Sequence, residues 1–124
     1  MTRSLFARPR ALAGLHAGYL IATGVWPLVH RRSFEAVTGP KAEFWLVRTV
    51  GGLAAACGVS LGAAVVRGRR PAEVQVLATA QALVFAAADV YAAATRSRIY
   101  LGDVAFQAAC VPAWLTSWER PRDD

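Results

Sequence analysis

Residues 44–66 read FWLVRTVGGLAAACGVSLGAAVV, and this stretch decides the fold. Among its twenty-three residues the polar side chains are Arg48, Thr49 and Ser60. A helix at the surface of a soluble protein carries polar residues along one whole face, which this stretch lacks. A helix that crosses a membrane needs about 20 mostly apolar residues. We therefore predict a transmembrane helix over residues 44–66.

Three further segments of the same kind surround it, at residues 11–29, 72–94 and 99–118. The chain has 124 residues, of which 56% are hydrophobic and 18% are charged, and this length suits a single domain. The sequence predicts an all-α protein, a four-helix transmembrane bundle over residues 1–124. The alternative, a water-soluble bundle of four alanine-rich helices, would require far more polar surface.

The longest connection, residues 30–43, is predicted to be ordered and to lie at the membrane interface. Ser33 is a candidate cap for a short helix through Glu35 and Val37, and Gly39 with Pro40 would end that helix. Glu43 would then fall in the first turn of the next helix, where a negative charge is favourable. The aromatic anchors expected at this interface are Phe34, Phe44 and Trp45.

Basic residues give the chain a net charge of +6, and most of them lie between the apolar segments. Nucleic-acid binding is not predicted, because such binding needs basic residues gathered on one face. Eight of the fourteen basic residues fall at the two termini and in residues 67–70, and five fall in the other two connections. Cytoplasmic loops carry the excess of Lys and Arg, so both termini are predicted to be cytoplasmic.

Three charged residues interrupt the predicted spans: Arg48, Asp89 and Asp103. At 1.5 Å per residue, each lies about 6–8 Å below the membrane face that also carries residues 30–43. All three therefore fall in the same leaflet. Charged side chains within a membrane span usually face the interior of the bundle or a wet cavity.

Helical periodicity places the polar residues of the last segment on one stripe, at Asp103, Gln107, Cys110 and Trp114. The opposite stripe is small or apolar and suited to lipid: Leu101, Ala105, Ala108 and Pro112. We predict an ion-paired polar core in which Arg48 lies between Asp89 and Asp103, because a guanidinium can hold two carboxylates at once. Gln81 and Gln107 would be its hydrogen-bonding neighbours.

Two interpretations of this core remain open. It could simply hold the helices together, as buried ion pairs do. Alternatively, two acids facing one base would leave a carboxylate able to bind a proton or an organic cation. The sequence does not decide between them.

The remaining candidate residues carry weaker signals: His16, Glu35, Glu43 and Trp45. A buried, hydrogen-bonded packing role is the ordinary expectation for His16. The Cys and His residues lack metal-binding spacing, so no metal site and no cofactor are predicted. Residues 58–62 match the G-x-S-x-G pattern of hydrolases without its strand-to-helix context, and two glycines four apart in a membrane helix indicate close packing. The sequence thus favours a protein that is not an enzyme.

The stretch from Gly24 through Trp26-Pro27 and Thr38-Gly39-Pro40 to Arg48 and Gly51 resembles small, uncharacterised four-span bacterial integral membrane proteins. The resemblance covers about the first half of the chain. It implies a bacterial inner membrane location and no particular activity. In size and span number the chain is also similar to small multidrug-resistance exporters, which carry an essential Glu in their first span; this chain has no acid there.

These observations leave two function classes in competition. The first is a small binding or accessory membrane protein, with membrane lipids and a small hydrophobic or cationic ligand as its partners. The second is a small proton-coupled transporter or exporter that acts as a homodimer. Transport would require a carboxylate that exchanges its proton and a path for water to reach it.

Overall fold

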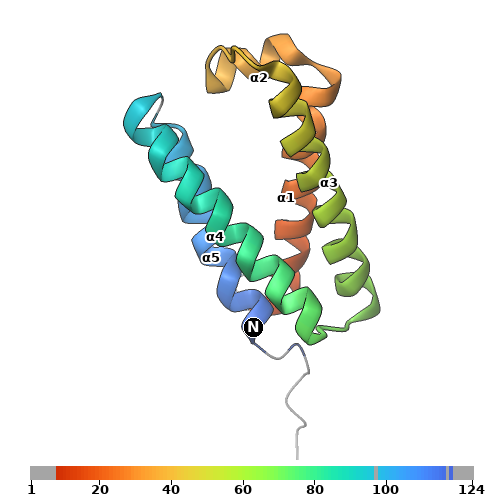
Figure 1. The fold of residues 1–124 in the computed structure, drawn as a ribbon. Helices are drawn as coiled ribbons and strands as arrows, with labels where there is room; N and C mark the ends of the chain where they lie inside the picture. The colour runs from red at the N-terminus through yellow and green to blue at the C-terminus, as the bar shows by residue number, and fades with distance from the viewer. Residues whose placement is uncertain (1–7, 97, 117, 119–124) are drawn as a thin grey trace, which may run out of the picture.

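The protein is all-helical, as predicted, in a computed structural model that describes residues 8–96, 98–116 and 118 (Figure 1). Five helices and no strands occur in those residues. The helices are α1 (Pro9–Val29), α2 (Arg31–Thr38), α3 (Phe44–Arg67), α4 (Ala72–Thr95) and α5 (Tyr100–Leu115).

Three of these helices, α1, α3 and α4, are long and apolar enough to cross a membrane. Their most apolar windows have mean hydropathies of 1.4, 1.8 and 1.6. Helix α5 is apolar too, but it has 16 residues and is therefore about 24 Å long, shorter than a hydrocarbon core of about 30 Å. The fourth segment, expected over residues 99–118, is thus helical only as far as Leu115.

The helices are arranged as two pairs, which are joined by contacts between α1 and α5 (Figure 1). Helix α1 packs along α3, and α4 packs along α5; α1 also contacts α5. In Figure 1 the two pairs lie close together at the end where α1 begins, at Pro9, and diverge toward the end where α2 lies. We call the end near Pro9 the base and the end near α2 the roof.

Glycines allow α1 and α3 to approach until their backbones touch. A Cβ on Gly24 would lie 2.4 Å from the Gly51 carbonyl oxygen, and a Cβ on Gly51 would lie 2.5 Å from the Gly24 oxygen. One contact further along, a Cβ on Gly58 would lie 2.8 Å from the Ala17 oxygen. Small residues at helix interfaces in membranes serve this close approach, so Gly58 has the packing role expected from the sequence.

Arginine side chains secure the base by binding helix C-terminal carbonyls. Arg10 donates to the Val65 and Val66 oxygens at 3.0 and 3.2 Å, and Arg70 donates to the Trp114 oxygen at 2.8 Å. Gly68 ends α3 in the left-handed conformation, with φ of +66°, which glycine adopts without strain. Cations suit these positions because the helix dipole is negative there.

The residue that caps the start of α2 differs from the one predicted. Helix α2 starts at Arg31, and its cap is His30, whose ring Nδ1 accepts a hydrogen bond from the Ser33 backbone N–H at 3.2 Å. The assignment of Ser33 as the cap is therefore wrong, because the imidazole at His30 supplies the acceptor. Gly39 follows the helix with φ of +94°, and the helix ends there as the sequence predicts.

Candidate functional site

A pocket of about 710 Å³ lies between the two helix pairs, below the roof. All five helices contribute to its walls, which are predominantly apolar. Aromatic rings from α1, α2, α4 and α5 border it, namely Tyr19, Trp26, Phe34, Phe85, Tyr100 and Phe106. Pockets of this size suit a small organic molecule, which is held by apolar contact and oriented by a few polar groups.

The acidic groups of this pocket are Asp89 on α4 and Asp103 on α5. Their side chains adjoin each other. The Tyr19 hydroxyl on α1 donates a hydrogen bond to Asp103 Oδ1. Asp89 is 8% exposed, and its Oδ2 has no hydrogen-bond partner among the residues that the structure describes. The site therefore presents an unused carboxyl oxygen inside apolar walls.

Arg48 does not join the two acids, so the predicted ion-paired core is wrong on this point. Its side chain is exposed, and its guanidinium lies over the Phe44 ring, 5.2 Å from the ring centroid. The reason is the rotation of α3. Glycines occur on two neighbouring stripes of that helix, and contact with α1 uses the stripe of Gly51 and Gly58 rather than that of Gly52, which turns Arg48 away from α4 and α5.

A second polar cluster is buried next to the pocket toward the base. It joins His16 to Gln81 and Gln107, and its contact with Trp114 is the part that the sequence did not predict. His16 is 0% exposed, and its ring Nδ1 accepts a hydrogen bond of 2.9 Å from the indole N–H of Trp114. Indole nitrogen is only ever a donor. Nδ1 is therefore the unprotonated nitrogen, and the hydrogen of the neutral ring is on Nε2.

This tautomer fixes the orientation of the Gln107 amide. The ring Nε2 of His16 lies 2.8 Å from Gln107 Oε1, so the ring N–H donates and the amide oxygen accepts. Gln81 brings its amide nitrogen to 3.0 Å from the same Nε2, while its own Oε1 is buried without a partner. Turning over the Gln81 amide would give the ring N–H a second acceptor, but it would break the hydrogen bond of 3.0 Å that the amide nitrogen donates to the Ala78 oxygen.

Trp114 therefore belongs to the core. It is 0% exposed and packs against Trp118 and His16, with ring centroids 5.4 and 6.3 Å apart. Helical periodicity placed Trp114 on the stripe of Asp103 and Gln107, opposite the stripe suited to lipid, and its burial agrees with that placement.

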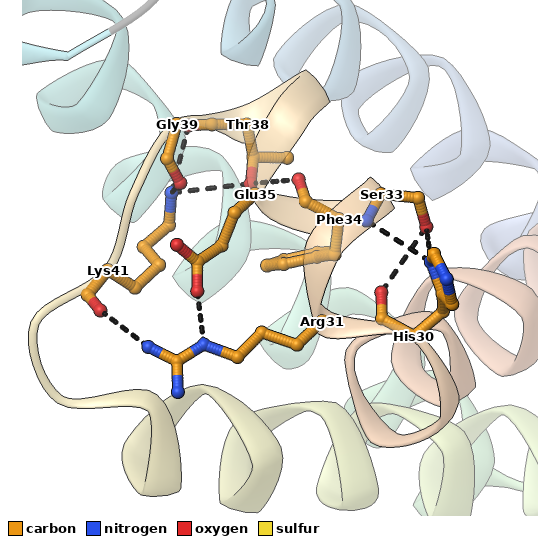
Figure 2. A network of polar contacts seen from close by, with 8 residues as sticks. All are labelled: His30, Arg31, Ser33, Phe34, Glu35, Thr38, Gly39 and Lys41. Atoms are coloured by element: carbon orange, nitrogen blue, oxygen red, sulfur yellow. Dashed lines mark hydrogen bonds and ion pairs between the residues drawn. The ribbon is translucent and has the colours of Figure 1, made fainter.

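The roof is held by a polar network on α2 (Figure 2). Lys41 donates to the Thr38 and Gly39 carbonyl oxygens at 2.8 and 2.7 Å, and to the Thr38 hydroxyl at 3.3 Å. Figure 2 shows the lysine amine turned toward these C-terminal groups of α2. An ammonium group has three N–H bonds, so the three contacts occupy all of them. Lys41 borders the pocket without a free donor for a ligand.

Glu35 also belongs to the roof rather than to the pocket. Arg31 donates to its carboxylate, and this hydrogen bond holds the pKa of Glu35 below its usual value. At a pH above the usual pKa of Glu35, the contact contributes fully to the stability of the roof. This contribution is lost as the pH falls through the lowered pKa. The other two secondary candidates pair with each other at the start of α3, where Trp45 donates to Glu43 Oε2 at 2.9 Å.

The structure thus brings together four of the five residues that the sequence placed in a polar core. Asp89, Asp103 and Gln107 border one pocket, and Gln81 contacts the cluster beside it. Among the residues that the structure describes, no group of three or more His, Cys, Asp or Glu side chains could hold a metal ion.

Comparison with protein-family models, curated proteins and solved structures gave no match. The class of this protein, an all-helical chain with three helices able to cross a membrane, accordingly rests on its own geometry.

Proposed function

We propose that this chain is a small integral membrane protein that binds a hydrophobic amine in the pocket between its two helix pairs. The observation that carries the proposal is the unpartnered Oδ2 of Asp89 in apolar walls. A carboxylate in such surroundings needs a positive partner or a hydrogen-bond donor. Asp103 adjoins it and reinforces the preference for a cation.

Charge selectivity follows from the cations near the pocket. Lys41 is the basic residue that borders it, and its ammonium group is already bound to oxygens of α2. Arg48 points away, over Phe44. An anionic head group would therefore meet two carboxyl groups and no available cation, whereas an amine would gain a charge-assisted hydrogen bond.

The proposed setting is the bacterial inner membrane, with α5 in a fourth crossing and both termini in the cytoplasm. Three apolar helices support the membrane location. The lipid-facing stripe of α5 supports the fourth crossing, because Leu101, Ala105, Ala108 and Pro112 are all exposed. A hydrophobic amine would reach the pocket from the bilayer, in which such molecules accumulate.

The test is binding of dodecylamine to the full chain in a non-ionic detergent, with dodecanol and dodecanoate as neutral and anionic probes. We expect dodecylamine to bind most tightly and Asp89→Asn to weaken it about tenfold or more, because a hydrogen bond to a charged group contributes about 1.5–3 kcal/mol. Native mass spectrometry and isothermal calorimetry would measure this.

The matched control is Glu73→Gln, which removes a carboxylate from the exposed first turn of the same helix. It should bind dodecylamine as the unchanged protein does. Equal binding of dodecylamine and dodecanol, or equal weakening by both substitutions, would contradict the proposal.

Proton-coupled export is the second candidate, and the adjoining carboxyl groups of Asp89 and Asp103 favour it. Such a pair could exchange a proton for a bound cation, and a homodimer could form the path. If so, a pH gradient across proteoliposomes should drive uptake of dodecyltrimethylammonium, and Asp89→Asn should abolish it. No gradient-driven uptake by a protein that still binds the probe would leave binding as its function.

A further inference from the structure

We infer that Gln107 is a specificity-determining residue, and that the ligand carries a hydrogen-bond acceptor close to its amine nitrogen. This inference rests on the proposed amine site, and it specifies a second functional group that the ligand carries. Gln107 is 1% exposed and borders the pocket, one helical turn from Asp103. Side chains one turn apart on a helix are neighbours.

Trp114, which does not line the pocket, sets the tautomer of His16. Its indole N–H is an unambiguous donor to His16 Nδ1, and this leaves the ring hydrogen on Nε2. The Nε2–H requires an acceptor, which is Gln107 Oε1 at 2.8 Å. The orientation of the amide therefore follows from hydrogen-bond chemistry at each step.

With its oxygen bound to His16, the Gln107 amide directs its NH₂ group elsewhere. Within the described part of the chain, the hydrogen bond that the Gln107 side chain makes is the one through Oε1, and its Nε2 donates to no protein group there. Because the residue borders the pocket, this NH₂ group is left to donate to a ligand there. The site then offers an acceptor at Asp89 and a fixed donor at Gln107.

A simple alkyl amine uses only the first of these groups. An amino alcohol, or an amine with a nearby carbonyl, uses both, because its oxygen accepts from the amide NH₂. A polar site that is built for such a group discriminates against the analogue that lacks it, since the buried donor is then left unpaired.

The probes are dodecylamine and 1-amino-2-dodecanol, which share chain length and charge and differ by a hydroxyl group. We expect the full chain in non-ionic detergent to bind the amino alcohol about two- to tenfold more tightly. In Gln107→Leu the ratio of the two affinities should fall to about one, whatever the absolute affinities become. A circular dichroism spectrum like that of the unchanged protein shows that this variant is folded.

A second measurement needs no variant of Gln107. Nitrogen NMR of the His16 ring should show a protonated Nε2 and an unprotonated Nδ1. Trp114→Phe keeps an aromatic ring and removes the donor that sets this tautomer, so the preference for the amino alcohol should fall.

The outcomes separate the two proposals. If neither amine binds, the proposed function fails, and this inference fails with it. If both amines bind equally to the unchanged protein, the amine site stands and this inference is overturned. A hydrogen on Nδ1 of His16, or a preference that survives in Gln107→Leu, would also overturn it.

Discussion

Gly24→Ala is expected to destabilise the protein by about 3 kcal/mol or more. The added Cβ would lie 2.4 Å from the Gly51 oxygen and 2.7 Å from the Ala55 nitrogen. Both atoms belong to the backbone of α3, so no side chain can rotate to make room, and α1 must move away from α3. Overpacking costs about 1–3 kcal/mol where side chains adjust, and rigid backbone places this case at the upper end.

Gly18→Ala is the matched control on the same helix, because a Cβ there would meet nothing within 4 Å. Unfolding in mixed micelles of non-ionic detergent and dodecyl sulfate, followed by circular dichroism, would measure both variants. Gly18→Ala should leave the midpoint unchanged. Similar midpoints for the two variants would show that α1 and α3 do not touch at Gly24.

Trp114→Ala is expected to cost about 3–5 kcal/mol, the range for removing a buried aromatic side chain. Trp114 is 0% exposed, and its removal would leave a cavity beside Trp118 and His16. It would also take away the donor to His16 Nδ1. Both losses fall at the base, where the two helix pairs lie close together.

The control is Trp45→Ala, because the Trp45 side chain is 64% exposed and its indole N–H donates to Glu43, two residues away in the sequence. The same unfolding measurement should show a small change for Trp45→Ala and a large one for Trp114→Ala. An equal loss in the two variants would mean that Trp114 is not a core residue.

Periodicity alone predicted which face of α5 points inward. Gln107, Cys110 and Trp114 are buried, and the opposite stripe is exposed, because one amphipathic helix contains all the information needed. The same reasoning failed for Arg48, because α3 is apolar nearly all round and has glycines on two neighbouring stripes. Which stripe packs depends on the partner helix, and sequence spacing on one helix does not specify it.

The pairing of His16 with Trp114 was out of reach for a related reason. Their positions are 98 residues apart in the sequence, and their hydrogen bond forms because α1 contacts α5. The periodicity of one helix predicts which of its faces is buried. A site formed between helices also depends on which helices are neighbours, and that periodicity does not specify this. The sequence placed Asp89 and Asp103 at the same depth in the membrane. It did not predict that the Tyr19 hydroxyl on α1 would donate a hydrogen bond to Asp103.

The roof has a consequence for how fast a molecule could reach the pocket. Tyr100, at the start of α5, donates a hydrogen bond of 3.2 Å to the Thr38 oxygen at the end of α2. Breaking such a hydrogen bond costs about 0.5–1.5 kcal/mol. Separating the two helix pairs at the base would instead break the buried contact between Trp114 and His16. Exchange with the bilayer is therefore expected to pass between α2 and α5, and to require that the hydrogen bond from Tyr100 to Thr38 break.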